Sequence, residues 1–273
     1  MEQRVAWLYG YYSEDPNYPE GVRVNIEALY DPPQFGEMNG FHILQDDQEV
    51  FVDMIAANLG LMKVGWIYTS LNHESFLTPK EIKEIASMQE KFAVNHPEGV
   101  KVPKFVTIVC KPKGDGGESG LDCYMVSDQC QALERDNMLE VSDDHTKLMA
   151  RQPDENEMVP TIVQEGKPVK QFDPEFFIVT LPNGMPKNAK EYSILKNYDF
   201  LAANRQMKPN KNDVKNYIRA HKSDNSYEKF ANFNFLLYII KELDIDTVCV
   251  IAEKIAKEEQ IDDFLVELVE NLG

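Results

Sequence analysis

The sequence VGWIYTSLNHESFLTPKE, Val64–Glu81, determines the fold expected for this chain. Its first residues belong to a strand-like run, Lys63–Thr69, that is rich in β-branched and aromatic residues. A helix is expected to begin near Thr78, because threonine caps helices and Pro79 suits the first helical position. Glu81 stands three residues after the cap, as in a capping box. The stretch therefore predicts a strand, a polar loop and a helix.

The spacing of residues in this stretch resembles that of the JAMM-type metalloproteases, which have the MPN fold. Those proteins carry a strand reading VGWYHSHP within the pattern H-x-H-x7-S-x2-D. Two histidines at i and i+2 of an extended segment point the same way and hold one zinc ion with the aspartate. An upstream glutamate takes a proton from the zinc-bound water. Val64, Gly65 and Trp66 match this pattern, and Leu8 and Gly10 match the family's upstream strand.

The residues at the chemically active positions of that pattern are different here. Tyr68 and Ser70 replace the two histidines, Thr78 replaces the serine, Glu81 replaces the aspartate, and Gln3 replaces the upstream glutamate. A phenol and an alcohol hold their protons too tightly to replace two imidazoles at neutral pH. We therefore expect no catalytic residue, no bound metal and no cofactor.

Three longer runs extend the resemblance to the C-terminal part of the nuclear protein localization protein 4 family. They are QRVAWLYGYYSEDPNYPEGVRVNIEALYDPPQ from Gln3, LGLMKVGWIYTSL from Leu59, and KFVT from Lys104 followed by YMVSDQCQALERDNML from Tyr124. The resemblance covers essentially the whole chain and is strongest up to Leu139. It implies an MPN-type domain without zinc ligands, followed by a helical C-terminal domain.

The resemblance also implies a function, that of an adaptor without enzymatic activity. Members bind ubiquitin and polyubiquitin chains, and they pair with ubiquitin fusion degradation protein 1 and the valosin-containing AAA ATPase. Together these proteins deliver substrates for unfolding and proteasomal degradation, including degradation at the endoplasmic reticulum. Members also carry an N-terminal ubiquitin-like domain and zinc fingers that dock on the ATPase. This sequence contains neither, so it is expected to be a fragment.

A peptide-binding groove is expected on the MPN-type domain, because the family is associated with holding an extended segment there. Such grooves bind through strand addition and aromatic walls. The candidate lining residues are Tyr9, Tyr11, Tyr12, Trp66, Tyr68 and Ser70. The alternative is that the aromatic residues of these strands belong to the core.

The resemblance to the MPN fold implies an α+β fold, with a mixed sheet flanked by helices over residues 1–184 and a helical domain over 185–273. Residues 140–174 are expected to form an irregular extension, either a partner contact or a long loop. A helix is expected at Gln45–Leu61, because the apolar residues Val50, Met54, Ala57 and Leu61 follow one another at spacings of four, three and four. The other expected elements are strands at Arg4–Tyr12, Val22–Tyr30, Lys104–Cys110, Leu121–Val126 and Glu175–Leu181, and helices at Asp128–Leu133, Asn212–His221, Asn225–Leu243, Asp246–Glu258 and Gln260–Leu272.

The charge of the chain is strongly negative, with 28 Lys+Arg against 46 Asp+Glu among 273 residues. Such a field repels phosphate backbones and anionic lipids and favours partners with basic surfaces, such as ubiquitin. The alternative is that the acidity only keeps the chain soluble. No apolar run reaches the roughly 20 residues of a membrane-spanning helix, and no signal peptide is recognisable. We therefore expect no membrane insertion. The family resemblance implies a location in the cytoplasm and nucleus or at the surface of the endoplasmic reticulum and nuclear envelope.

Two other functions remain open at this level. One is an active isopeptidase with a shifted metal site that uses His73 and Glu74. The other is a structural MPN subunit of a complex such as the proteasome lid or the signalosome. The four cysteines lack the spacing of a zinc knuckle, although Cys123 and Cys130 are close enough in sequence to pair.

Overall fold

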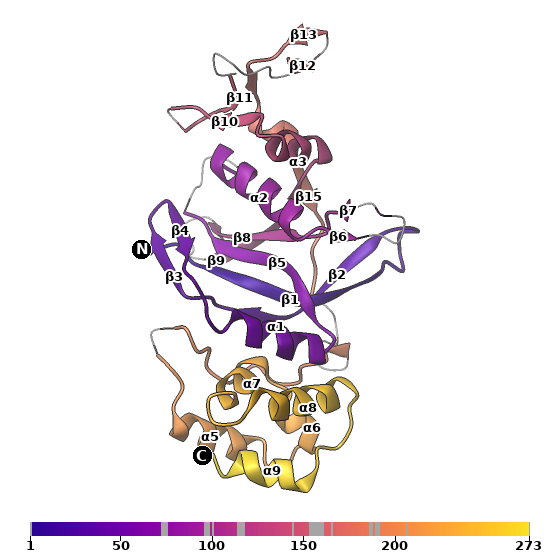
Figure 1. Ribbon diagram of the computed structural model, residues 1–273, viewed down its shortest axis with the longest axis vertical. Helices are drawn as coiled ribbons and strands as arrows, with labels where there is room; N and C mark the ends of the chain where they lie inside the picture. The colour runs from indigo at the N-terminus through magenta and orange to yellow at the C-terminus, as the bar shows by residue number, and fades with distance from the viewer. Residues whose placement is uncertain are drawn as a thin grey trace. The chain divides into compact units, whose positions relative to one another are not determined.

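The computed structural model describes residues 2–71, 76–95, 99, 101–113, 118–143, 145–152, 161–164, 166–185, 188, 192–205 and 207–272. The chain forms two compact units, which Figure 1 shows in colours that follow the sequence. Unit 1 comprises Met1–Gly65 and Gly184–Gly273, and unit 2 comprises Trp66–Asn183. The division into domains at residues 184 and 185 stays a prediction.

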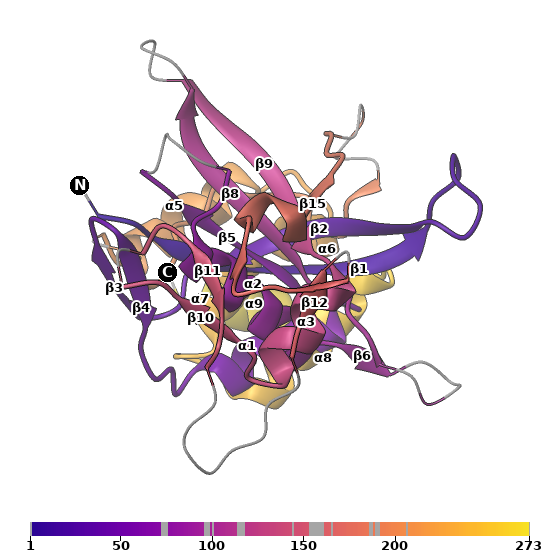
Figure 2. The same cartoon turned by 90° about the horizontal axis from the view of Figure 1, so that it is seen from above.

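A six-stranded mixed sheet confirms the α+β class. Its strand order is β15-β9-β8-β5-β1-β2. The bounds are β1 (Val5–Glu14), β2 (Val22–Tyr30), β5 (Met62–Thr69), β8 (Val106–Lys113), β9 (Glu118–Val126) and β15 (Ile178–Leu181). Figure 2 shows β8 and β9 as a long hairpin.

The hairpin of β1 and β2 in unit 1 contains a bulge. Tyr9 pairs with Ala28 and Gly10 pairs with Ile26, so Glu27 is the extra residue on β2. A bulge bends its strand and can aim a side chain in a new direction. Gly10 is required here, because a Cβ at this position would lie 1.9 Å from the carbonyl oxygen of Asn25. Two short strands, β3 (Gln34–Glu37) and β4 (Gly40–Ile43), form a separate hairpin that the sequence pattern did not indicate.

Helix α1 (Glu49–Asn58) is shorter than expected, and the apolar face of Val50, Met54 and Ala57 is not its buried face, although Leu61 after the helix is buried. Val50 and Met54 are 66% and 38% exposed, whereas the buried residues of the helix are Val52, Ile55 and Ala56. Both faces of this helix carry apolar residues, so periodicity alone could not choose between them. Helix α1 packs against α7 (Phe233–Ile239) and α8 (Ile245–Ala256), beside which it lies in Figure 1. This packing determines which face of α1 is buried.

The C-terminal helices predicted from the sequence are present in unit 1. They are α5 (Lys211–Ala220), α6 (Ser226–Phe230), α7, α8 and α9 (Asp263–Glu270). The single helix expected over Asn225–Leu243 is wrong, because it is two helices, α6 and α7. Asn232 separates them: its backbone is extended, and its side chain accepts the N–H of Phe235 to cap α7. Six of the seven residues of α7 are buried, as the apolar run predicted.

In unit 2, α2 (Pro79–Lys91) and α3 (Asp128–Arg135) lie side by side near the sheet, as Figure 1 shows. Buried Gln89 joins α2 to the end of β9. Its side-chain amide accepts the N–H of Val126 at 2.7 Å and donates to the carbonyl of the same residue at 3.3 Å.

Two expectations for unit 2 are corrected. The described part of residues 140–174 contains short strands where irregular structure was expected. The sequence showed no long alternating run there, because each strand has only two or three residues. The strand expected at Glu175–Leu181 begins as a 3-10 helix, Pro174–Phe177, because Asp173 caps it, and only Ile178–Leu181 pairs with β9. The short strands are β10 (Leu139–Val141), β11 (Leu148–Ala150), β12 (Val163–Gln164), β13 (Lys167–Pro168) and β14 (Gln171–Phe172).

Candidate functional site

Strand β5 carries the two residues at the histidine positions of the zinc pattern. Tyr68 and Ser70 stand two residues apart, at the end of the strand and directly after it, and they are only 2% and 1% exposed. Thr69 between them is exposed. Buried Trp66, two residues before Tyr68, donates its indole N–H to the hydroxyl of Thr107 at 2.7 Å. The alternation of a strand therefore places all three side chains on the buried face.

Glu81, at the third ligand position, lies close enough to Tyr68 for its charge to act on the phenol. Burial raises the pKa of Tyr68 well above its usual value, and the negative charge of Glu81 raises it further. The phenol is therefore protonated at neutral pH.

The residues at the serine and third-ligand positions, Thr78 and Glu81, also cap helix α2. The carboxylate of Glu81 accepts the backbone N–H of Thr78 at 2.7 Å, and the hydroxyl of Thr78 accepts the N–H of Glu81 at 3.2 Å. This reciprocal capping box starts the helix. One carboxylate oxygen of Glu81 is therefore engaged by the backbone N–H of Thr78.

Lys111 of β8 brings a positive charge to the same region. Its ammonium donates to the carbonyl oxygen of Phe76 at 2.5 Å. Burial lowers the pKa of Lys111, while the charges of Glu81 and Asp122 oppose that effect. Sequence reasoning missed this residue. The one available signal was a lysine that ends an apolar strand and is followed by proline.

These donors do not fit a catalytic zinc ion. A protonated phenol, a buried alcohol and a carboxylate engaged in a helix cap offer no set of three zinc ligands. Within the described ranges, no group of three His, Cys, Asp or Glu side chains could hold a metal ion. His73 and Glu74, the residues of the alternative metal site, lie outside the described residues.

Gln3, at the position of the general base, belongs to unit 1. Its side chain is buried, and its amide donates to the carbonyl oxygen of Met38 at 3.2 Å. An amide used in this way has no basic lone pair for proton abstraction.

The candidate groove residues differ sharply in exposure. Tyr9, Trp66, Tyr68 and Ser70 are buried, which leaves Tyr11 and Tyr12 with side-chain surface for a partner. The hydroxyl of Tyr9 donates to Asp53 at 2.6 Å, so this tyrosine is part of the packing of unit 1. Burial raises the pKa of Tyr12 to about 12. A binding role for any of these residues stays a prediction.

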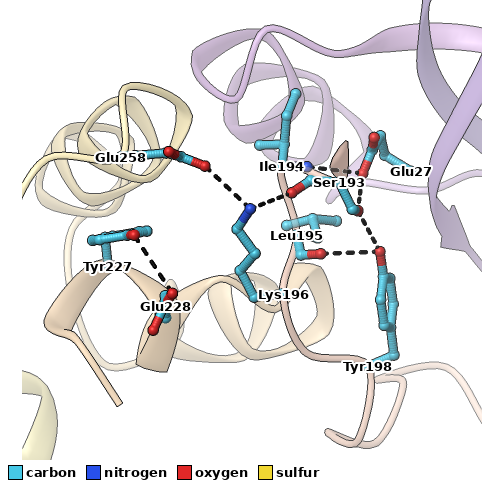
Figure 3. A network of polar contacts seen from close by, with 9 residues as sticks. All are labelled: Glu27, Ser193, Ile194, Leu195, Lys196, Tyr198, Tyr227, Glu228 and Glu258. Carbon is cyan, nitrogen blue, oxygen red and sulfur yellow. Dashed lines mark hydrogen bonds and ion pairs between the residues drawn. The ribbon is translucent and has the colours of Figure 1, made fainter. Parts of the chain in front are cut away.

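A second cluster of polar groups, shown in Figure 3, lies within unit 1. The carboxylate of Glu27, aimed by the bulge in β2, accepts the hydroxyl of Ser193 and the N–H of Ile194. Lys196 donates to the carbonyl of Ser193 at 2.7 Å and pairs with Glu258 at 3.1 Å. These contacts attach the segment 192–205, which we call the linker segment, to the rest of unit 1. We read them as structural contacts.

Comparison with known proteins gives the family. Residues 4–267 match the NPL4 family. The chain belongs to the NPL4 family. Its relatives include the nuclear protein localization protein 4 homologs of Homo sapiens and Mus musculus, each 30% identical over 270 residues. These alignments cover 87% of this chain and 44% of each relative. Nuclear protein localization protein 4 of Debaryomyces hansenii is 29% identical over 309 residues, covering 99% of this chain and 52% of that protein.

The chain spans about half the length of the curated NPL4 relatives that it matches. Membership of the NPL4 family confirms the resemblance stated for the sequence runs around Gln3, Leu59 and Lys104. In the described part of the chain, every helix is too short or too polar to cross a membrane.

Proposed function

We propose that this NPL4-family chain is a non-enzymatic adaptor that binds ubiquitin and polyubiquitin chains. Together with ubiquitin fusion degradation protein 1, it would present substrates to the valosin-containing AAA ATPase for unfolding and proteasomal degradation. Docking on the ATPase itself would depend largely on the parts of the family's proteins that this chain does not match. The proposed locations are the cytoplasm and nucleus, and the surface of the endoplasmic reticulum and nuclear envelope.

The chemistry around Tyr68 carries the non-enzymatic part of the proposal. Tyr68 holds its proton because burial and the carboxylate of Glu81 raise its pKa. Glu81 in turn is occupied by the backbone of Thr78. Hydrolysis of an isopeptide bond by a metalloprotease needs a metal-activated water and a general base, and these side chains supply neither.

Surface and charge support the binding part of the proposal. The chain is formally −18 at pH 7, which favours partners with basic surfaces. Tyr11 and Tyr12 lie on β1, just past the point where it faces the bulge of β2, and they remain half-exposed. Tyrosine gives a large contact area at a low cost in side-chain entropy, so it is a frequent centre of binding energy.

The proposal is tested by titrating the chain with lysine-48-linked polyubiquitin in a binding assay. We expect saturable binding, weakened about tenfold by the double substitution Tyr11→Ala and Tyr12→Ala. Tyr18→Ala is the matched control, because Tyr18 is an exposed tyrosine in the turn of the same hairpin. No saturable binding would overturn the ubiquitin-binding proposal. Equal weakening by the control would remove Tyr11 and Tyr12 from the proposed site.

The enzymatic alternative is tested with lysine-48-linked diubiquitin, incubated with the chain in the presence of zinc and again with a chelator. We expect intact diubiquitin in both samples. Cleavage that the chelator abolishes would show an active isopeptidase. A pulldown then separates the adaptor from a structural subunit: recovery of ubiquitin fusion degradation protein 1 supports the adaptor, and recovery of only proteasome lid or signalosome subunits contradicts it.

A further inference from the structure

His221 at the end of helix α5 lies between two carboxylates. Its Nδ1 is 2.7 Å from Oδ2 of Asp224, in the turn after the helix, and its Nε2 is 2.9 Å from Oδ2 of Asp199, in the linker segment. The imidazole is 14% exposed and contacts the ring of Tyr217, with 4.6 Å between centroids. The titratable groups around this ring are therefore Tyr217 of α5, Asp224 of the turn and Asp199 of the linker segment.

The protonation state of His221 follows from this geometry. A neutral imidazole has one N–H and one acceptor nitrogen, whereas an ionised carboxylate is only an acceptor. In a neutral ring, one nitrogen lone pair would face a carboxylate at hydrogen-bonding distance, which is repulsive. An imidazolium has two N–H groups and satisfies both aspartates. The carbonyl groups at the C-terminus of α5 also favour a positive charge there.

The charge of His221 would hold the part of the linker segment around Asp199, and the other contacts of this part are as follows. The N–H groups of Lys196 and Asn197 both donate to the carbonyl oxygen of Ala231, at 3.0 and 3.1 Å. Phe200, next to Asp199, is buried against Tyr217, with 5.4 Å between ring centroids. The contact of His221 with Asp199 joins this part of the segment to the end of α5.

We propose that His221 is a protonation-dependent clamp that holds the linker segment against helix α5. In the protonated state, one cation joins Asp199 and Asp224. Loss of the proton removes one of the two hydrogen bonds and leaves two carboxylates beside a ring that no longer offsets their charge. The segment around Asp199 is then free to separate from the end of α5.

The direction of the pH dependence follows from the pKa of His221. Burial lowers this pKa, but the hydrogen bonds and charges of Asp199 and Asp224 outweigh burial and raise it above the ordinary value. Because the folded pKa is raised, protonated His221 stabilises the clamp, and this stabilisation is complete at pH values below the pKa of His221 in the unfolded chain. The stabilisation is lost as the pH rises through the folded value.

Nuclear magnetic resonance of the imidazole nitrogens tests the proposal, because it separates the imidazolium from either neutral form. The reference is His221 in the urea-unfolded chain. We expect the midpoint of His221 to lie at a higher pH in the folded protein than in the unfolded chain, and Asp199→Asn to move the folded midpoint down. A folded midpoint at or below the unfolded one, or one unchanged in Asp199→Asn, would overturn the proposal.

Hydrogen exchange of the linker-segment amides provides the conformational readout. Protection of residues 192–205, corrected for intrinsic exchange, should fall as the pH rises through the His221 midpoint. Each unit by which that midpoint exceeds the unfolded value corresponds to about a tenfold change in protection. His221→Arg keeps the charge at every pH of the experiment, so its protection should lose this dependence. If His221→Arg does not fold, the loss of pH dependence is sought in Asp199→Asn. Constant protection in the wild type contradicts a clamp.

Discussion

Glu27 and Ser193 are 166 residues apart in the sequence, and the hydroxyl of Ser193 donates to the carboxylate of Glu27. Glu27 is 9% exposed, so this bond and the N–H of Ile194 replace water that its carboxylate would bind in the unfolded chain. A residue of the second strand thereby holds the segment that leads into the C-terminal helices. This attachment gives the first of five predictions.

Ser193→Ala should destabilise the protein by about 1–3 kcal/mol, because a buried charged acceptor loses a donor. The free energy of unfolding is measured in urea. Tyr198 is 60% exposed, and its hydroxyl contacts Ser193 at 2.7 Å and donates to the carbonyl of Leu195 at 3.1 Å. Tyr198→Phe removes these contacts but leaves the bond from Ser193 to Glu27, so it is the control with an expected change smaller than that of Ser193→Ala. Equal stability of Ser193→Ala and the wild type would show that Glu27 does not depend on this bond.

Gly10→Ala should destabilise unit 1 by about 1–3 kcal/mol, because the added methyl group would collide with the carbonyl of Asn25 in the bulge. Gly184→Ala is the matched control, since a Cβ there has no atom within 4 Å. Urea denaturation compares the two variants. If both substitutions have the same small effect, the close approach at the bulge is not needed.

Thr78→Ala should cost about 1 kcal/mol, because the first turn of α2 loses the side chain that accepts the N–H of Glu81. Thr78→Ser should retain most of the stability, because it keeps the hydroxyl. The two midpoints of urea denaturation give the difference. A loss in Thr78→Ser as large as in Thr78→Ala would contradict a capping role.

Trp66→Phe should destabilise unit 2 by about 1–3 kcal/mol, since it leaves the buried hydroxyl of Thr107 without its indole donor. Thr107→Val removes the acceptor from the same bond. In a double-mutant cycle, the combined variant should cost less than the sum of the single changes. Additive costs would show that the two side chains do not interact.

Cys130 should resist alkylation in the folded protein at about pH 8, because the thiolate is the reactive form. Burial raises the pKa of Cys130 to about 12, so almost no thiolate is present at that pH. Cys110, Cys123 and Cys249 are half-buried and serve as internal comparisons. Mass spectrometry of peptides after iodoacetamide treatment should show Cys130 modified last, and rapidly only after unfolding. Modification of Cys130 as fast as Cys110 would contradict its burial.

Several elements could be predicted from local sequence because their signals are local. The capping box at Thr78 and Glu81 involves residues three apart, and strands β8 and β9 follow from the apolar runs Lys104–Cys110 and Leu121–Val126. The features that the sequence did not predict share another cause. The buried face of α1 depends on partners more than 170 residues away, and the short strands within residues 139–172 have too few residues to show a period.

The sequence by itself determined the α+β class, the family and the residue types at the zinc-ligand positions, because these follow from composition, spacing and order along the chain. Only the tertiary structure decided that Tyr68 is buried beside Glu81, that Glu27 reaches Ser193, and that His221 lies between two aspartates. Burial, pKa and hydrogen-bond partners depend on groups that folding brings together from distant parts of the chain. No local pattern of residues specifies them.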